Sequence, residues 1–390
     1  MILACEPVCR GFEHAAVNAA MLAVFKDAFP DEELLFTAEE GHLRLVAQDA
    51  GIVSRAGLTF QALPLPLRKA SSAERFDSGL RVVRSLFSSA ERRKASLVVF
   101  TCIDGETLHA IKMLLGESPG LRCIVVLHGI LSSVARSPSL LPWKNRHLFR
   151  NWLLRDHSER LSYIVQGESI ERELAVRFPA HRPHLMSIDL PFRFAAPEDH
   201  VPFQDRTVSF GSLGVLRKVK GSHLFLRLAG EAAAASTAYR PRFVCIGPIV
   251  DKKLRRLLTP AVSVPSPDAP LPLEAYAALT RKLDYAVLLH GAETALQGSG
   301  VLFDAFSYLK PVIALKSPFF SAYFDKMGNI GYLCDHYADL KRRVLALLDN
   351  PPVDEYLLQR QALLTGREQL QIPVLAVTLR RKLSPAVRST

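Results

Sequence analysis

The sequence predicts an α/β protein made of two doubly wound domains that face a common cleft. Short apolar runs alternate with amphipathic stretches along both halves of the 390 residues, and the apolar runs are continuous. Continuous apolar strands that alternate with helices are typical of a parallel sheet covered on both faces. A chain of this length is too long for one ordinary core and suits two domains.

In the first half, predicted strands and helices alternate up to a proline-rich segment. Its predicted strands are residues 1–7, 33–39, 58–66, 96–103, 122–129 and 162–167, and its main helices are residues 14–29, 74–94 and 106–116. At residues 187–205, prolines and charged residues replace the periodicity, which indicates a linker. We therefore assign residues 1–192 to an N-terminal domain.

The alternation of predicted strands and helices resumes in the second half. Strands are expected at residues 207–214, 240–249, 261–266, 285–290, 310–315 and 330–335, and helices at residues 251–258, 273–283 and 337–350 and from Gly221 and Ser299. Residues 205–365 form the second predicted domain, and residues 366–390 are expected to return to the first. Ligands of such sheets bind beyond the carboxyl ends of the strands, so the loops there are where chemistry is expected.

Composition narrows the class of protein. The chain is 49% apolar and 22% charged, as in soluble globular proteins, and no apolar run reaches the ~18 residues that span a bilayer. Its start lacks the features of a signal peptide. Six scattered cysteines without metal spacing predict buried thiols in a reducing cytoplasm. The net charge of +11 favours anionic partners, and no zinc-finger or RNA-recognition signature favours nucleic acid.

One loop with small and basic residues follows the strand at residues 207–214. Glycines there allow close approach of the backbone, and the helix that begins near Gly221 offers free N–H groups to an anion. Basic side chains stand where a phosphate would lie. The residues concerned are Gly211, Gly214, Arg217, Lys218 and Lys220. The alternative is a solvated basic turn ahead of a surface helix.

A second loop of this kind follows the strand at residues 285–290. The helix that opens at Ser299 and Gly300 is apolar at positions 301, 302, 303, 306 and 309, which leaves little exposed face for Asp304. A carboxylate at the edge of a buried helix needs partners such as sugar hydroxyls. In the alternative interpretation, the glycines only turn the chain, and Asp304 lies on a solvent-exposed face of the helix.

Residues 205–350 resemble the donor-site region of GT-B glycosyltransferases, especially those related to glycogen synthase and sucrose synthase. The resemblance lies in the order of "FGSLG", "RKVKG", "FVCIGPI", "QGSGVLFDAFSYLKPVIA" and "IGYLCD". It implies two Rossmann-like domains, a Lys220 that contacts the nucleotide pyrophosphate, and an Asp304 that holds the ribose. The nucleotide-sugar residues that we assign are Gly211, Gly214, Arg217, Lys218, Lys220, Gly247, Glu293, Gln297, Gly298, Ser299, Gly300 and Asp304.

The chain departs from the family's Glu-x7-Glu motif. Asp304 matches the second acid, but Leu296 stands where the first acid would be, and Gln297 and Glu293 are the nearest polar residues. Donor binding is still expected, and the stereochemical course of the reaction stays open.

The N-terminal half is expected to bind the acceptor. An inverting transferase needs a base for the acceptor hydroxyl, and Asp, Glu and His can each serve. The candidates after the strands are Glu13, His14, Asp104, Glu106 and His128. Each has an ordinary structural alternative, such as a helix cap for Asp104, a first-turn acid for Glu106 or a core histidine for His128.

Residues 140–160 interleave aromatic and basic side chains. This pattern suits a helix that lies on an anionic membrane, or else a solvated helix packed on the domain edge. The residues are Trp143, Lys144, Arg146, Arg150, Trp152 and Arg155.

The sequence therefore predicts a cytoplasmic hexosyltransferase of GT-B fold, peripheral on the inner membrane face if its acceptor is lipid-linked. Such an enzyme would move a sugar from a nucleotide diphosphate sugar to a carbohydrate or lipid-linked acceptor, plausibly in bacterial surface polysaccharide synthesis. No cofactor is expected, and without an Asp-x-Asp motif no metal is expected. The alternatives are a nucleotide-sugar 2-epimerase of the same fold and a catalytically silent nucleotide- or sugar-binding module.

Overall fold

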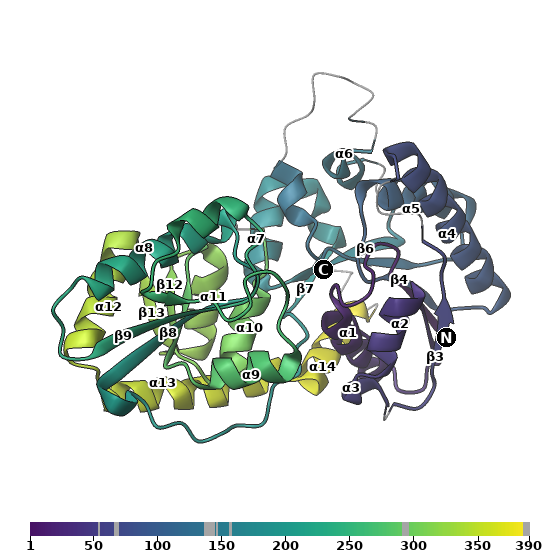
Figure 1. Ribbon diagram of the computed structural model, residues 1–390. Helices are drawn as coiled ribbons and strands as arrows, with labels where there is room; N and C mark the ends of the chain where they lie inside the picture. Colours follow the sequence, from purple (N-terminus) through teal and green to yellow (C-terminus); the bar gives the residue numbers. More distant parts are fainter. Residues whose placement is uncertain are drawn as a thin grey trace. The chain divides into compact units, whose positions relative to one another are not determined.

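The structure, a computed structural model, describes residues 1–53, 55–65, 70–135, 145, 147–155, 158–290 and 296–384. The chain divides into two compact units, each with its own parallel sheet and covering helices (Figure 1). The first unit comprises Met1–Arg193, Leu296–Gly298 and Leu370–Thr390, and the second comprises Phe194–Ala295 and Ser299–Gln369. Among the described helices, none is long and apolar enough to span a bilayer.

The described part of the first unit holds a seven-stranded parallel sheet in the order β3-β2-β1-β4-β5-β6-β7. The strands are β1 (Ile2–Cys5), β2 (Leu34–Ala38), β3 (Leu58–Ala62), β4 (Leu97–Phe100), β5 (Cys123–Val126), β6 (Leu161–Gln166) and β7 (Leu185–Ile188). The helices are α1 (Ala15–Ala28), α2 (Glu40–Ala47), α3 (Ala50–Val53), α4 (Ser72–Arg92), α5 (Gly105–Glu117), α6 (Phe149–Leu153), α7 (Glu168–Arg177) and α14 (Ile372–Leu383), with 3-10 helices η1 (Leu131–Ala135) and η3 (Pro179–His184).

The second unit repeats the same strand order, β10-β9-β8-β11-β12-β13, again parallel. The strands are β8 (Thr207–Leu213), β9 (Arg240–Ile246), β10 (Val262–Ser263), β11 (Tyr285–Leu288), β12 (Val312–Leu315) and β13 (Gly331–Cys334). The helices are α8 (Ser222–Ala233), α9 (Leu273–Arg281), α10 (Gly300–Ser307), α11 (Pro318–Met327), α12 (Tyr337–Asp349) and α13 (Val353–Gly366), with 3-10 helices η4 (Gln204–Arg206), η5 (Lys218–Lys220), η6 (Lys252–Leu257) and η8 (Arg367–Leu370).

In both units the order reverses beside the first strand, which creates a switch point. β1 pairs with β2 on one side and with β4 on the other, through Leu3 with Leu35 and Val98. β8 likewise lies between β9 and β11. Ligands of doubly wound sheets bind at the carboxyl ends of the strands at such a point. The loops after β1 and β4, and those after β8 and β11, are therefore the places to examine.

The C-terminal helix α14 belongs to the core of the first unit. Its buried residues Leu375, Ala376 and Leu379 share one apolar cluster with α1 residues such as Leu22 and Phe25. The helix begins with a proline at its first turn, where the missing N–H costs nothing.

Most predicted elements are present, with two differences of note. β7 lies within a stretch that the sequence partly assigned to the linker, because its four residues follow a 3-10 helix with two prolines and give no periodicity. The helix predicted at residues 251–258 is the 3-10 helix η6, in which only Leu254 is buried. All six cysteines are buried free thiols, as the sequence predicts.

Candidate functional site

The switch point of the first unit is centred on a buried glutamate, Glu6, which directly follows β1. Its Oε1 accepts hydrogen bonds from the backbone N–H groups of Val8 and Cys9, both at 2.9 Å. Its Oε2 accepts from Asn18 Nδ2 and Thr101 Oγ1, also at 2.9 Å. Four donors therefore occupy the lone pairs of this fully buried carboxylate, so that the loop after β1 is fixed to α1 and β4.

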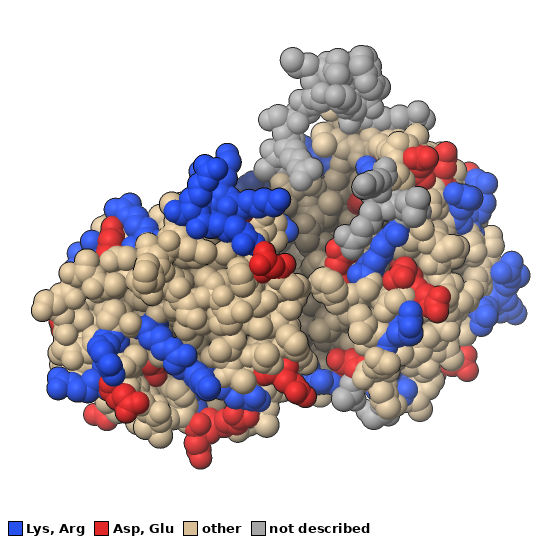
Figure 2. Space-filling model, in the orientation of Figure 1, with Lys and Arg blue, Asp and Glu red and all other residues tan. Residues whose placement is uncertain are grey.

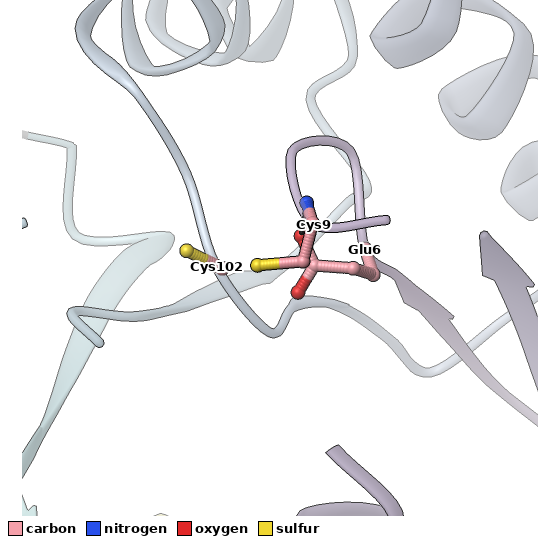
Figure 3. A group of neighbouring side chains, drawn as sticks. All are labelled: Glu6, Cys9 and Cys102. Carbon is pink, nitrogen blue, oxygen red and sulfur yellow. Dashed lines mark hydrogen bonds between the residues drawn. The ribbon is translucent and has the colours of Figure 1, made fainter. Parts of the chain in front are cut away.

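Figure 3 shows the side chains of Cys9 and Cys102 next to Glu6. Among the described residues, one potential ligand atom from each of these three lies within 4.8 Å of the others, which is a spacing that could hold a metal ion. However, both oxygens of Glu6 already accept two hydrogen bonds each. A hydrogen bond with Cys9, followed by burial, also holds the pKa of the Cys102 thiol well above its usual range, which disfavours a thiolate ligand. The trio therefore fits a packed structural cluster better than a metal site.

Two predicted catalytic histidines meet beside this cluster. His14 Nδ1 contacts His128 Nε2, and His128 Nδ1 contacts Gln166 Oε1. With the Gln166 oxygen as acceptor, His128 carries its proton on Nδ1 and accepts from His14, which leaves His14 Nε2 as a lone-pair acceptor. Burial lowers the pKa of His128 to about 4, so this ring is neutral at pH 7. The arrangement suits a proton acceptor.

His14 adopts a left-handed backbone conformation, with φ of 55°. This conformation is uncommon for a residue other than glycine and costs about 1 kcal/mol or more. It places the exposed imidazole at the start of α1, with the ring edge-on to His128 at a centroid distance of 4.2 Å. Strained backbone conformations are enriched at functional sites, which supports His14 as a candidate.

The two acidic residues near this switch point, Asp104 and Glu106, differ in how far other protein groups already engage them. Asp104 caps α5 by accepting from Thr107 N at 2.8 Å, and burial followed by the nearby Glu106 raises its pKa. Glu106 is buried and ion-paired with Arg75 at 2.6 Å, and the same oxygen accepts from Ser72 Oγ. The predicted cap of Asp104 is therefore present, and Glu106 is engaged in joining α5 to α4.

A pocket of about 210 Å³ opens within the first unit next to these residues. Its lining includes Arg10, Glu13, Arg75 and Asp104. Glu13 Oε2 accepts from the backbone N–H of Arg10 at 3.3 Å. Two guanidinium groups and two carboxylates at the carboxyl ends of the strands give this pocket the polarity that a carbohydrate needs.

In the second unit, two glycines bring the switch-point loops together. Gly221, with φ of 72°, begins α8, and a Cβ there would lie 2.3 Å from the carbonyl oxygen of Leu289 at the end of β11. Gly247, with φ of 154°, follows β9, and a Cβ there would lie 2.1 Å from the carbonyl oxygen of Gly214. Any larger residue at either position would push the loops apart.

At position 211, which the sequence assigned to the nucleotide-sugar site, a glycine is needed for a different reason. It lies inside β8, where a Cβ would meet the side chain of Leu283 at 2.1 Å, so it makes room for packing and not for a ligand. Gly300 is the first residue of α10, and Gln297 and Gly298 lie just before it. Glu293 lies outside the described residues.

The predicted cation and acid of the second unit influence each other. Burial raises the pKa of Asp304 to about 6, against the opposing effects of a hydrogen bond from Tyr276 and of the Lys220 charge. Burial and the neighbouring Arg217 lower the pKa of Lys220, which Asp304 opposes. Tyr276 Oη donates to Asp304 Oδ2 at 2.9 Å, which leaves Oδ1 for another partner.

Three buried polar atoms near these groups have no hydrogen-bond partner among the residues that the structure describes. They are His223 Nδ1, His290 Nδ1 and Ser299 Oγ. They come from the first turn of α8, the end of β11 and the N-cap of α10, which are the elements that border the switch point. Burial, followed by the Lys220 charge, lowers the pKa of His290 to about 4, so its ring is neutral. Buried polar groups are almost always paired, so these three atoms require a partner that the described residues do not supply.

The basic residues of the loop after β8 differ in burial. Arg217 and Lys218 are exposed, and the Lys218 backbone N–H donates to Asp251 Oδ2 at 2.6 Å. Lys220 is half-buried, which places its ammonium nearer to Asp304 and His290. His223, His290 and Tyr276 were not predicted from the sequence. His290 had a usable signal, because it is a polar residue that ends an apolar strand at the switch point.

The described part of the predicted membrane segment is packed. Phe149 and Leu153 of α6 are buried, and the ring of Trp152 stacks on His109 at a centroid distance of 3.5 Å. Arg150 is half-buried and Arg155 is exposed. Trp143, Lys144 and Arg146 lie outside the described residues.

Comparison with known proteins reveals similarity in structure but not in sequence. No family model matches the chain, and no curated protein is significantly similar in sequence. HepE from Anabaena, solved in complex with UDP-glucose, has 13% identity and a TM-score of 0.65 over 98% of each chain. The UDP-forming α,α-trehalose-phosphate synthase from Burkholderia vietnamiensis has 12% identity and a TM-score of 0.64 over 100% of this chain and 98% of its own.

A third similar structure is WaaG, a glycosyltransferase involved in lipopolysaccharide biosynthesis. It has 9% identity and a TM-score of 0.62 over 99% of this chain and 100% of its own. These similarities span both units together with the connections between them. The fold is GT-B. The fold predicted from the sequence is thereby confirmed.

Proposed function

We propose that this GT-B chain is a hexosyltransferase that uses a nucleotide diphosphate sugar, of the kind related to glycogen synthase and sucrose synthase. The observation that carries the proposal is the group of buried atoms on His223, His290 and Ser299 that have no partner among the described residues, next to Lys220 and Asp304. A nucleotide diphosphate sugar offers the phosphate oxygens and hydroxyls that these groups lack. HepE, of the same fold, was solved with UDP-glucose.

Each group has a role that its chemistry suits. Lys220 and Arg217 offset the charge of the diphosphate, which grows as the sugar leaves. Asp304 Oδ1 accepts from ribose hydroxyls, while Tyr276 donates to its other oxygen. The neutral His290 and the Ser299 hydroxyl donate to phosphate or sugar oxygens.

The first unit supplies the acceptor pocket lined by Arg10, Glu13 and Asp104. In an inverting reaction, His14 Nε2 takes the acceptor hydroxyl proton. The hydroxyl oxygen then bonds to the anomeric carbon, and the bond from that carbon to the diphosphate breaks. Asp104 is the second base candidate, because burial raises its pKa toward the working range. No metal ion or cofactor takes part in this proposal.

The acceptor that we propose is a carbohydrate or a lipid-linked carbohydrate of bacterial surface polysaccharide synthesis, reached from the cytoplasmic side. WaaG, a structural neighbour, acts in lipopolysaccharide biosynthesis. A lipid-linked acceptor would require the protein to lie peripherally on the membrane.

A thermal-shift panel with UDP, GDP, ADP and CMP tests the donor site first. The matching nucleotide stabilises by ~2.7 kcal/mol at a hundredfold excess over its dissociation constant. NMR of the sugar products, with and without an acceptor and with a chelator present, then tests the reaction. Epimerised sugar from donor alone would identify a 2-epimerase. If no nucleotide shifts the melting temperature and no donor is consumed, the chain is not a transferase.

A further inference from the structure

We propose that the second unit carries a docking face for an anionic membrane surface, on the outer side of the loops after β8 and β9. Its cations are Lys252, Lys253 and Arg256, and its apolar side chains are Val219, Val250 and Leu257. None of these residues has a role in the proposed transfer reaction. Failure of the docking face would therefore leave the proposed transfer reaction unaffected, although a lipid-linked acceptor would use such a face.

Backbone contacts place the two loops side by side. Leu216 and Ile249 form a parallel bridge, and the Val250 N–H donates to the Leu216 oxygen at 3.2 Å. Asp251 accepts from the backbone N–H of Lys218 at 2.6 Å, which fixes η6 beside η5. Buried Leu254 anchors η6 in the core. The side chains at 252, 253, 256 and 257 are consequently held on the outside of a fixed turn.

The positive charge of the docking face is not neutralised. Within the described residues, Lys252, Lys253 and Arg256 form no ion pair with a carboxylate, whereas the neighbouring Arg255 is paired with Asp268. Asp251 is engaged with the Lys218 backbone. Lysine and arginine side chains gather densely in the region of α8 on the face shown in Figure 2. Unpaired cations on a rigid turn attract an anionic surface.

The apolar side chains decide the kind of partner. Val219, Val250 and Leu257 are 55%, 49% and 47% exposed, and they lie on the two adjoining loops rather than scattered over the surface. Aliphatic side chains among lysines and arginines suit the headgroup boundary of a lipid bilayer. A nucleic-acid surface would instead use aromatic side chains for stacking, and none of the six residues is aromatic. The geometry thus favours lipid over nucleic acid.

Vesicle flotation tests this inference with the full chain. Wild type is expected to bind phosphatidylcholine–phosphatidylglycerol vesicles and not pure phosphatidylcholine vesicles. Binding should weaken as the Debye length falls from ~10 Å at 0.1 M salt to ~3 Å at 1 M. The triple variant K252E/K253E/R256E should lose at least about tenfold in vesicle binding. If it fails to fold, K252Q/K253Q/R256Q serves the same comparison.

A matched control separates the docking face from net charge. R84E/R92E/R93E makes the same change of charge on exposed positions of α4 and its C-cap in the first unit, and it should bind vesicles like wild type. V250S/L257S should lower binding by a few-fold and leave its salt dependence unchanged.

Three results would overturn the proposal. Wild type that ignores anionic vesicles at low salt has no such surface. An equal loss in the α4 control would make the attraction a property of net charge alone. Binding to duplex DNA or single-stranded RNA that only the triple variant loses, without vesicle binding, would assign the surface to nucleic acid.

Discussion

The two units share one strand order, yet their switch points are filled in opposite ways. In the first unit, the carboxylate of Glu6 has four donors at 2.9 Å, all from the protein. In the second, His223, His290 and Ser299 present buried polar atoms with no partner among the described residues. Within the described residues, the Glu6 carboxylate of the first unit is saturated with protein donors, whereas the three atoms of the second unit still have capacity for a partner.

His42 extends the saturated network of the first unit. Its Nδ1 lies 2.9 Å from the Gly11 oxygen and its Nε2 lies 2.9 Å from Asn18 Nδ2. Because a carbonyl can only accept, Nδ1 carries the proton and Nε2 accepts from Asn18. Asn18 then uses both of its amide protons, one on His42 and one on Glu6. The loop that leads to His14 is held by this chain of bonds.

The largest effect is expected from breaking that network. Glu6→Ala would leave two buried N–H groups and the side chains of Asn18 and Thr101 without their acceptor. We expect a loss of about 3–5 kcal/mol in the unfolding free energy of the first unit, measured by urea titration. Exposed Glu40→Ala is the control and should change little. A Glu6→Ala protein as stable as the control would contradict the interpretation that Glu6 holds this loop in place.

A pH effect comes next, from Asp304. Its folded-state pKa of about 6 lies above the ordinary value of 3.8, so the folded protein holds the proton more tightly. The stabilisation is full below pH 3.8 and is lost as the pH rises to about 6, by on the order of 2–3 kcal/mol. Asp304→Asn should flatten the unfolding free energy across this window. Exposed Asp325→Asn should keep the wild-type profile, and parallel profiles for wild type and Asp304→Asn would refute the prediction.

A smaller effect, in binding rather than stability, is expected at Lys220. Lys220→Ala removes a charge-assisted contact and should weaken nucleotide diphosphate binding or donor turnover at least ~10-fold. Because burial disfavours the Lys220 charge, the unliganded protein should not be destabilised. The change in affinity is measured by titration calorimetry with the nucleotide that the thermal-shift panel identifies. Exposed Lys282→Ala is the matched control, and equal affinities in both variants would remove Lys220 from the site.

The smallest change should come from Ser299→Ala. In the unliganded protein the hydroxyl has no partner among the described residues, so the unfolding free energy should change by less than ~0.5 kcal/mol. Nucleotide or donor affinity should nevertheless fall by a few-fold, the size of one ordinary hydrogen bond. A stability loss of more than ~1 kcal/mol without ligand would mean that the hydroxyl is structural.

Sequence reasoning assigned most residues of the proposed second site because their signals are local. Glycines, lysines and an acid after apolar strands mark a loop where the strand order reverses, and Lys220, Ser299 and Asp304 were assigned in this way. Tyr276 was missed because it approaches Asp304 from α9, 28 residues earlier in the chain, and nothing local marks the contact. His223 was hidden among the helix residues that follow the basic loop.

In the first unit, the sequence placed candidate histidines and acids in the loops after the strands but could not rank them. The pairing of His14 with His128 spans 114 residues, and that of Glu106 with Arg75 spans 31. Glu6 was not singled out, although an acid directly after a buried strand is the same kind of signal as His128. Non-local hydrogen bonding decides which of these groups is engaged and which is available.

The place of α14 bears on how the chain folds during synthesis. The helix completes the core of the first unit, and the residues of the second unit lie between it and the rest of that core. In covalent terms, the second unit is an insertion within the first. Its whole sequence has left the ribosome before Leu375 and Leu379 can reach α1. The second unit can therefore finish folding first, although it starts later, and the N-terminal sheet must wait with part of its apolar surface uncovered.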